Sequence, residues 1–155
     1  MNIGLVIYSW SGHTLEVAEK LKSKLESAGH AVTLLPVELT AERKQEARDF
    51  EIAGLADLSS YESIVFGAAV EAFSLSPVLS AYLSKIDSLS GKKVACLVSQ
   101  QFPFAWMGGN RALNQMKKLC RAKGASIIGS AVVHWTASKR EASIASALDS
   151  LTRSH

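Results

Sequence analysis

The chain has 155 residues and a formal net charge of +3, and 48% of its residues are hydrophobic against 20% charged. This length and composition predict one domain spanning residues 1–155 with a hydrophobic core, and they exclude a disordered chain. The small positive charge excludes the strongly basic surface of a nucleic-acid-binding protein. Because no apolar run reaches about 18 residues and no basic residue precedes the first apolar stretch, we expect a cytoplasmic protein with neither membrane span nor secretory signal.

The first half of the chain begins with an apolar run at residues 3–8. A helical pattern follows from about residue 12 to residue 28, and Gly29 ends it. The apolar positions on one face of this helix are Ala18, Leu21, Leu25 and Ala28. Residues 31–37 are predicted to form the second strand. Residues 40–57 are polar and show only a weak pattern.

The second half repeats the alternation of strand and helix. Residues 63–69 are continuously apolar, which is typical of a strand buried on both faces. Pro77 begins a helix whose apolar positions are Leu79, Tyr82, Leu83 and Ile86. The elements predicted after it are a strand over 93–99, a helix over 111–123 closed by Gly124, a strand over 126–134 and a helix over 141–151.

Five apolar runs separated by helices predict an α/β fold, with a doubly wound, five-stranded parallel sheet in a three-layer α/β/α arrangement. In such sheets, ligands bind beyond the carboxyl ends of the strands, where the strand order reverses. The loops expected at that edge are residues 9–14, 69–76 and 100–109.

The loop after the first strand carries the clearest motif, Ser9-Trp10-Ser11-Gly12-His13-Thr14. Hydroxyl groups and the free backbone N–H groups of a helix start are suited to hold a phosphate, and Gly12 allows close approach. No lysine or arginine lies within the loop, so it matches neither a nucleoside-triphosphate loop nor the three-glycine dinucleotide motif. Two alternatives remain open: Ser11 or Thr14 only caps the helix, and His13 is an exposed side chain without a role.

The two other loops are unusually apolar. Residues 100–109 contain three aromatic residues and a methionine, and residues 69–76 contain Phe73 and Leu75. Such loops are suited to form the walls around a flat ligand; alternatively, the side chains only pack under a neighbouring helix. Ser76 is expected to cap the next helix, and Glu71 to be a solvated loop carboxylate.

Taken together, the sequence resembles the flavodoxin-like family of FMN proteins. Flavodoxins have a T/S-x-T/S-G-x-T phosphate loop after the first strand, which Ser9, Ser11, Gly12 and Thr14 match, with His13 where asparagine is common. The resemblance implies strand order 2-1-3-4-5 and bound FMN, with residues 68–76 and 99–109 enclosing the flavin ring. The cofactor-binding residues expected are Ser9, Trp10, Ser11, Gly12, His13, Thr14, Ala68, Ala69, Val70, Phe73, Ser99, Gln100, Gln101, Phe102, Phe104, Trp106 and Gly108. Trp106 is the first candidate to stack on the flavin, with Phe104 second.

Three departures from electron-carrier flavodoxins bear on the reaction. The isoelectric point is near 8.9, whereas those proteins are typically acidic. Residues 68–76 contain no glycine, so the peptide rotation that stabilises one-electron reduced flavin would meet Cβ resistance. No tyrosine lies in residues 100–109. These departures leave open an NAD(P)H-dependent FMN oxidoreductase or quinone reductase beside an electron carrier whose partner is a redox protein or a small-molecule electron acceptor.

The remaining sequence features exclude other classes. A response-regulator receiver, the model for a non-flavin anion-binding regulatory module, needs an aspartate after the third strand, where Gly67, Ala68 and Ala69 stand. Cys96 and Cys120 lack the spacing of a metal or redox motif and are expected to be reduced structural thiols. We therefore expect no metal site, and the sequence identifies no catalytic residue.

Overall fold

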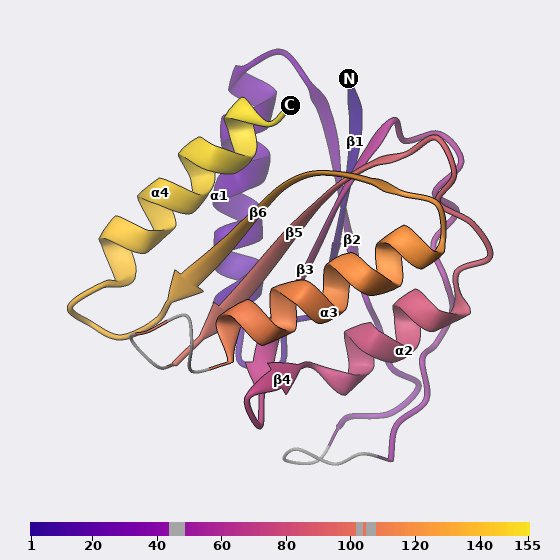
Figure 1. Ribbon diagram of the computed structural model, residues 1–155, viewed down its shortest axis with the longest axis horizontal. Coiled ribbons are helices and arrows are strands. Elements are labelled where there is room, and N and C mark those ends of the chain that lie inside the picture. The colour runs from indigo at the N-terminus through magenta and orange to yellow at the C-terminus, as the bar shows by residue number, and fades with distance from the viewer. Residues whose placement is uncertain (44–48, 102–103, 105–107) are drawn as a thin grey trace.

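The computed structural model describes residues 1–43, 49–101, 104 and 108–155 (Figure 1). Its parallel strands are β1 (Asn2–Ile7), β2 (Ala31–Pro36), β3 (Ser63–Glu71), β5 (Lys93–Gln100) and β6 (Ser126–His134). They follow the order β2-β1-β3-β5-β6, which confirms the predicted doubly wound sheet. The order reverses between β1 and β3, so their carboxyl ends border a crevice.

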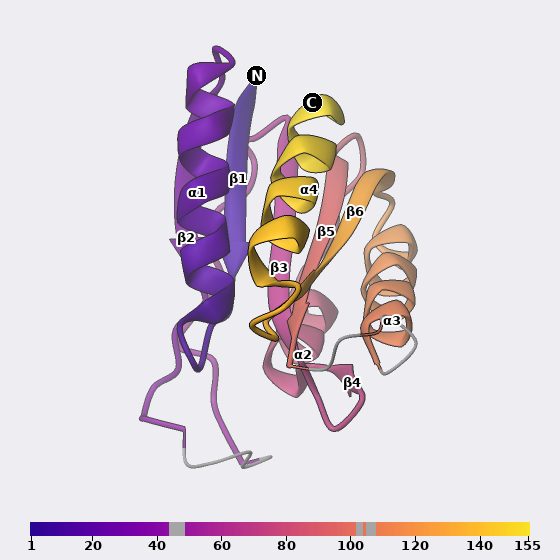
Figure 2. The same ribbon diagram turned by 90° about the vertical axis from the view of Figure 1, so that its left-hand side faces the viewer.

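In the described part of the chain, four helices cover the two faces of this sheet. The helices α1 (His13–Ser27) and α4 (Arg140–Arg153) pack on one face, and α2 (Pro77–Lys85) and α3 (Gly109–Ala122) pack on the other (Figures 1 and 2). Burial on both faces explains the continuous apolar run of β3, in which Ile64, Val65 and Phe66 are inaccessible to solvent.

The apolar faces of the helices agree with the predicted spacing, with one exception. Leu21 and Leu25 of α1 are buried together with Val17, but Ala28 is the exposed C-cap residue, because the helix ends one residue earlier than predicted. The four apolar positions predicted after Pro77 are all buried. None of the described helices is both long and apolar enough to cross a membrane.

The segment predicted as a loop between the third strand and Pro77 is instead a β-hairpin. The strand β3 continues to Glu71, and a short strand β4 (Ser74–Leu75) pairs antiparallel with its end. The two-residue turn between them has positive φ at Ala72 (49°) and Phe73 (62°), a left-handed conformation that costs a non-glycine residue about 1–2 kcal/mol. The sequence did not predict this hairpin, because its turn lacks the asparagine or glycine that usually marks such a turn.

Two smaller predictions also need correction. Ser76 occupies the N-cap position of α2, but its side chain makes no capping hydrogen bond, and among the described residues its buried hydroxyl has no partner. The helices α3 and α4 begin earlier than expected, at Gly109 and Arg140.

The two cysteines are free and buried, as predicted. Although they are far apart in sequence, β5 and α3 bring Cys96 and Cys120 together, and a hydrogen bond to Cys96 together with burial raises the pKa of the Cys120 thiol. A raised pKa keeps the thiol protonated and unreactive.

Candidate functional site

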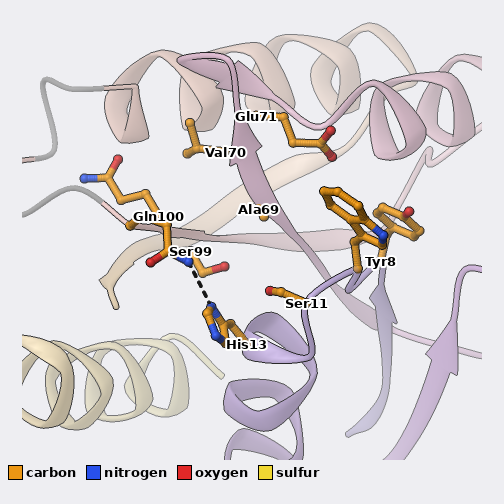
Figure 3. Close-up of a pocket in the computed structure, with 10 residues that line it drawn as sticks. Tyr8, Ser11, His13, Ala69, Val70, Glu71, Ser99 and Gln100 are labelled. Carbon is orange, nitrogen blue, oxygen red and sulfur yellow. Dashed lines mark hydrogen bonds between the residues drawn. The ribbon is translucent and has the colours of Figure 1, made fainter. Parts of the chain in front are cut away.

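A cavity of about 220 Å³ opens at the carboxyl edge of the sheet, where the ends of β1, β3 and β5 meet (Figure 3). The residues that line it are Tyr8, Trp10, Ser11, His13, Ala69, Val70, Glu71, Ser99, Gln100 and Gln101. In Figure 3, Ser11 and His13 lie on the side of α1, and Val70 and Glu71 lie on the side of β3. The structure therefore brings parts of the three predicted loops to one cavity.

The N-terminus of α1 lies at this edge, and some of its backbone N–H groups are available to bind a ligand. Gly12, the N-cap residue, has a φ of 89°, which favours glycine. Its carbonyl accepts the first helical bond from the Glu16 N–H, and the Leu15 N–H donates to Ser9 Oγ over 3.1 Å. Within the described residues, the N–H groups of Gly12, His13 and Thr14 have no hydrogen-bond partner. Free N–H groups at the positive end of a helix fit an anion such as phosphate.

The three hydroxyl groups of the same loop have different surroundings. Ser11 is exposed and lines the cavity. Thr14 is buried, and its Oγ1 shares a hydrogen bond of 2.7 Å with Ser99 Oγ, which joins the start of α1 to the end of β5. Ser9 caps the helix from outside its first turn. The capping alternative thus describes Ser9, rather than Ser11 or Thr14.

His13 is half-buried, so the expectation of an exposed side chain is wrong. Its ring stacks on Trp135, which follows β6, with ring centroids 4.2 Å apart and planes inclined by 15°. Its Nδ1 lies 3.3 Å from Nε2 of Gln101. Burial and the positive charge of Arg140 lower the pKa of His13 against a smaller opposing effect of Glu16, so the neutral ring is favoured.

The expectation of a solvated Glu71 is wrong. Arg43 donates two hydrogen bonds to its carboxylate, from Nη1 to Oε2 over 2.9 Å and from Nη2 to Oε1 over 2.7 Å. The side chain of Arg43 is 1% exposed and that of Glu71 is 12% exposed. The Arg43 guanidinium also lies 5.6 Å from the ring centre of Trp10 and 5.8 Å from that of Phe50. The hydrogen bond to Glu71 raises the pKa of Arg43, so the group stays charged.

Arg43 comes from the segment whose sequence has little pattern. Backbone bonds from the Thr40 N–H to the Glu51 carbonyl and from the Ala53 N–H to the Glu38 carbonyl hold this segment beside the sheet edge. Arg43 could not be predicted from the sequence, because no residue near it in the chain indicates a partner 28 residues away. Tyr8, which lines the cavity, and Trp135, which stacks on His13, were also not predicted; both are aromatic residues that directly follow a strand.

Of the other expected cofactor-binding residues, Ala68, Phe73, Phe104 and Gly108 are described, and they differ in exposure. Ala68 is buried within β3, and Gly108 precedes α3 with a φ of 119°. Phe73 and Phe104 do not line the cavity and are 52% and 48% exposed; the Lys139 ammonium group lies 4.5 Å from the ring centre of Phe104. Phe102 and Trp106 lie outside the described residues. Within the described part of the chain, no three histidine, cysteine or acidic side chains gather as a metal site.

Comparison with known proteins identifies the fold. No family model and no curated protein sequence matches the chain. Among solved structures, oxidised flavodoxin 2 from Bacillus cereus matches with a TM-score of 0.71 at 20% identity, covering 99% of this chain and 97% of that one. A flavoprotein from Lactobacillus acidophilus in complex with FMN matches with a TM-score of 0.66 at 16% identity (84% and 92% covered). Two-electron reduced flavodoxin from Megasphaera elsdenii matches with a TM-score of 0.66 at 20% identity (87% and 88% covered). The chain therefore has the flavodoxin-like fold.

Proposed function

We propose that this protein binds FMN at the carboxyl edge of its sheet and moves electrons through the bound flavin. The observation that carries the proposal is the N-terminus of α1 next to the cavity, where the N–H groups of Gly12, His13 and Thr14 have no partner among the residues that the structure describes. A phosphate is suited to the helix terminus and a flat ring to the cavity, so one ligand would span both.

Two further observations support the choice of FMN. The Lactobacillus acidophilus flavoprotein has this fold and was crystallised with FMN, and a Fusobacterium nucleatum flavodoxin variant was also crystallised with it. The loop presents hydroxyl and N–H donors but no lysine or arginine, which suits a single phosphate whose charge need not be fully neutralised. When bound, the flavin would supply the redox chemistry, and this chain would bind and orient it.

Calorimetric titration of the cofactor-free protein with FMN, riboflavin and FAD tests this proposal. We expect FMN to bind at least tenfold more tightly than riboflavin, because only FMN has the terminal phosphate. We also expect weak binding of FAD, because we identify no second nucleotide site for its adenosine half. Equal affinities for FMN and riboflavin would remove the helix terminus from the site, and no binding of either would reject the proposal.

A second candidate, an NAD(P)H-dependent FMN oxidoreductase that reduces a quinone or another small acceptor, is favoured by basic residues on the β6 side of the cavity. Arg140 donates to the Trp135 carbonyl over 3.0 Å and lies near His13, and Lys139 precedes it. Cationic groups there would attract the phosphates of a nicotinamide nucleotide. Anaerobic mixing of FMN-loaded protein with NADPH or NADH separates the two functions, because rapid bleaching of the flavin absorbance is expected only of the oxidoreductase.

A further inference from the structure

The buried ion pair between Arg43 and Glu71 stands at the wall of the cavity. Glu71 lines the cavity, and the Arg43 guanidinium that binds its carboxylate lies near the rings of Trp10 and Phe50. The pair therefore connects three segments: the loop after β1, the segment before β3 and the end of β3.

The two charges cancel each other at this wall. The contact has two parallel N–H···O bonds, the geometry in which guanidinium and carboxylate interact most strongly. Because the Arg43 side chain is buried and that of Glu71 is mostly buried, either charge without its partner would be less screened than a surface charge and would act on neighbouring groups. A buried ion pair is weak evidence for a stabilising role, since apolar residues often serve stability as well.

We propose that Arg43 and Glu71 are positioning residues that keep this wall electrically neutral and thereby set the reduction potential of bound FMN. The inference rests on the proposed binding of FMN. Two-electron reduction, FMN + 2e⁻ + H⁺ → FMNH⁻, adds one negative charge to the ring system. A wall with net negative charge therefore opposes reduction, and a wall with net positive charge favours it.

Two single variants test the sign of this effect. Arg43→Met leaves the Glu71 carboxylate uncompensated, so we expect reduced FMN to lose about tenfold in affinity relative to oxidised FMN. Glu71→Gln leaves the guanidinium uncompensated, so we expect a change of similar size in the opposite direction. For a two-electron couple, a tenfold change in this ratio corresponds to a shift of about 30 mV in the midpoint potential. The potential is measured by anaerobic dithionite titration with a reference dye.

The double variant Arg43→Met/Glu71→Gln and the conservative variant Arg43→Lys complete the set. Both keep the wall neutral, so both are expected to restore a midpoint potential close to that of the wild type, even where FMN affinity falls. Because neither variant leaves a buried charge without a partner, both can still be measured if the single variants do not fold.

A surface ion pair provides the matched control. Lys22 and Glu26 form an ion pair of 3.1 Å on the exposed face of α1. Lys22→Met and Glu26→Gln make the same changes in charge where water screens them, and we expect no change in potential.

The outcomes separate this inference from the proposed function. FMN binding by the wild type, together with shifts of opposite sign in the two single variants and reversal in the double variant, would support it. Equal or unidirectional shifts would reject the role of the pair and leave FMN binding intact. Failure of the wild type to bind FMN would reject both.

Discussion

The two walls of the cavity are built in different ways. The wall beside α1 comes from the loop of residues 9–14, which provides hydroxyl and N–H groups and contains no lysine, arginine or acidic residue. The opposite wall depends on Arg43 and Glu71, which are 28 residues apart, and on a full positive and a full negative charge. The first wall is a local consequence of a strand followed by a helix, whereas the second exists only in the folded chain.

This difference implies different sensitivities. A neutral donor in the first wall contributes one hydrogen bond, and its removal should weaken binding of the phosphate without changing the charge of the site. A change in the second wall leaves a buried charge without its partner or moves the β3–β4 hairpin. It should therefore also change the stability of the protein and the midpoint potential of bound FMN. Five measurements test this difference between the two walls.

The largest effect is expected from Gly108→Ala, which disturbs the hairpin that carries Glu71. The φ of Gly108 is 119°, and a Cβ there would lie 2.8 Å from Val70 Cγ1 and 2.9 Å from Phe73 Cα. Backbone strain and overpacking together should lower the free energy of unfolding by about 2–4 kcal/mol, measured by urea denaturation. Gly29→Ala is the control: its φ is 96° but no atom lies near the added Cβ, so only about 1–2 kcal/mol is expected. Equal losses of unfolding free energy in the two variants would show that the hairpin moves to make room for the added methyl group.

Ser11→Ala and Thr14→Ala test the first wall. Each removes a hydroxyl group at the start of α1, and we expect each to weaken FMN binding by about 1.5–3 kcal/mol, as measured by calorimetry. Only Thr14→Ala should also lower the melting temperature of the cofactor-free protein, because it breaks the buried hydrogen bond to Ser99. If FMN affinity does not change in either variant, the loop is not a phosphate site.

The one-electron reduced state of the flavin tests the end of β3. Ala68 and Ala69 lie in the strand and pair with Val98 and Ser99 of β5, and Val70 pairs with Leu75. A rotated peptide at these non-glycine residues would cost about 1–2 kcal/mol. We therefore expect little one-electron reduced flavin during dithionite titration. Near-complete accumulation of the blue radical would contradict this and favour an electron carrier over an oxidoreductase.

Trp10 belongs to the first wall, lines the cavity and contacts Arg43 of the second wall. An aromatic ring next to a flavin quenches its fluorescence and contributes about 0.5–1.5 kcal/mol beyond area burial. Trp10→Leu should brighten bound FMN and weaken its binding by that amount. Trp106→Ala, at the position favoured by sequence, is the parallel experiment. The variant with unchanged fluorescence identifies the tryptophan that does not contact the flavin.

The smallest effect is expected at the amino edge of the sheet, far from both walls. His155 Nε2 lies 2.7 Å from Ser63 Oγ and its Nδ1 lies 2.7 Å from the Leu151 carbonyl, so the neutral ring donates to Leu151 and accepts from Ser63. Burial, with the nearby charges of His30, Lys93 and the N-terminus, lowers the pKa of His155 below 6.5. The unfolded chain then binds the proton more readily, so stability should fall as the pH decreases below about 6.5. His155→Asn should flatten this part of the stability profile without changing FMN affinity at neutral pH.

The sequence by itself determined the features that depend on residues close together in the chain. Hydrophobic runs and helical spacing were sufficient to predict the alternation of the five parallel strands with helices along the chain, because burial on both faces of a parallel sheet imposes those patterns directly. The hydroxyl-rich loop could also be predicted, because a strand, a glycine and a helix start position those residues without contacts from other segments. The first wall was predictable for this reason.

Only the tertiary structure decided the second wall. Ala72 and Phe73 adopt positive φ without glycine, which local preference disfavours and the pairing of β3 with β4 maintains. Arg43 is an arginine in a polar segment, and nothing near it in sequence distinguishes a buried cation from a solvated one. Its burial becomes favourable only when β3 brings Glu71 within 2.7 Å, because a guanidinium loses its water at low cost only where a carboxylate and aromatic rings replace it.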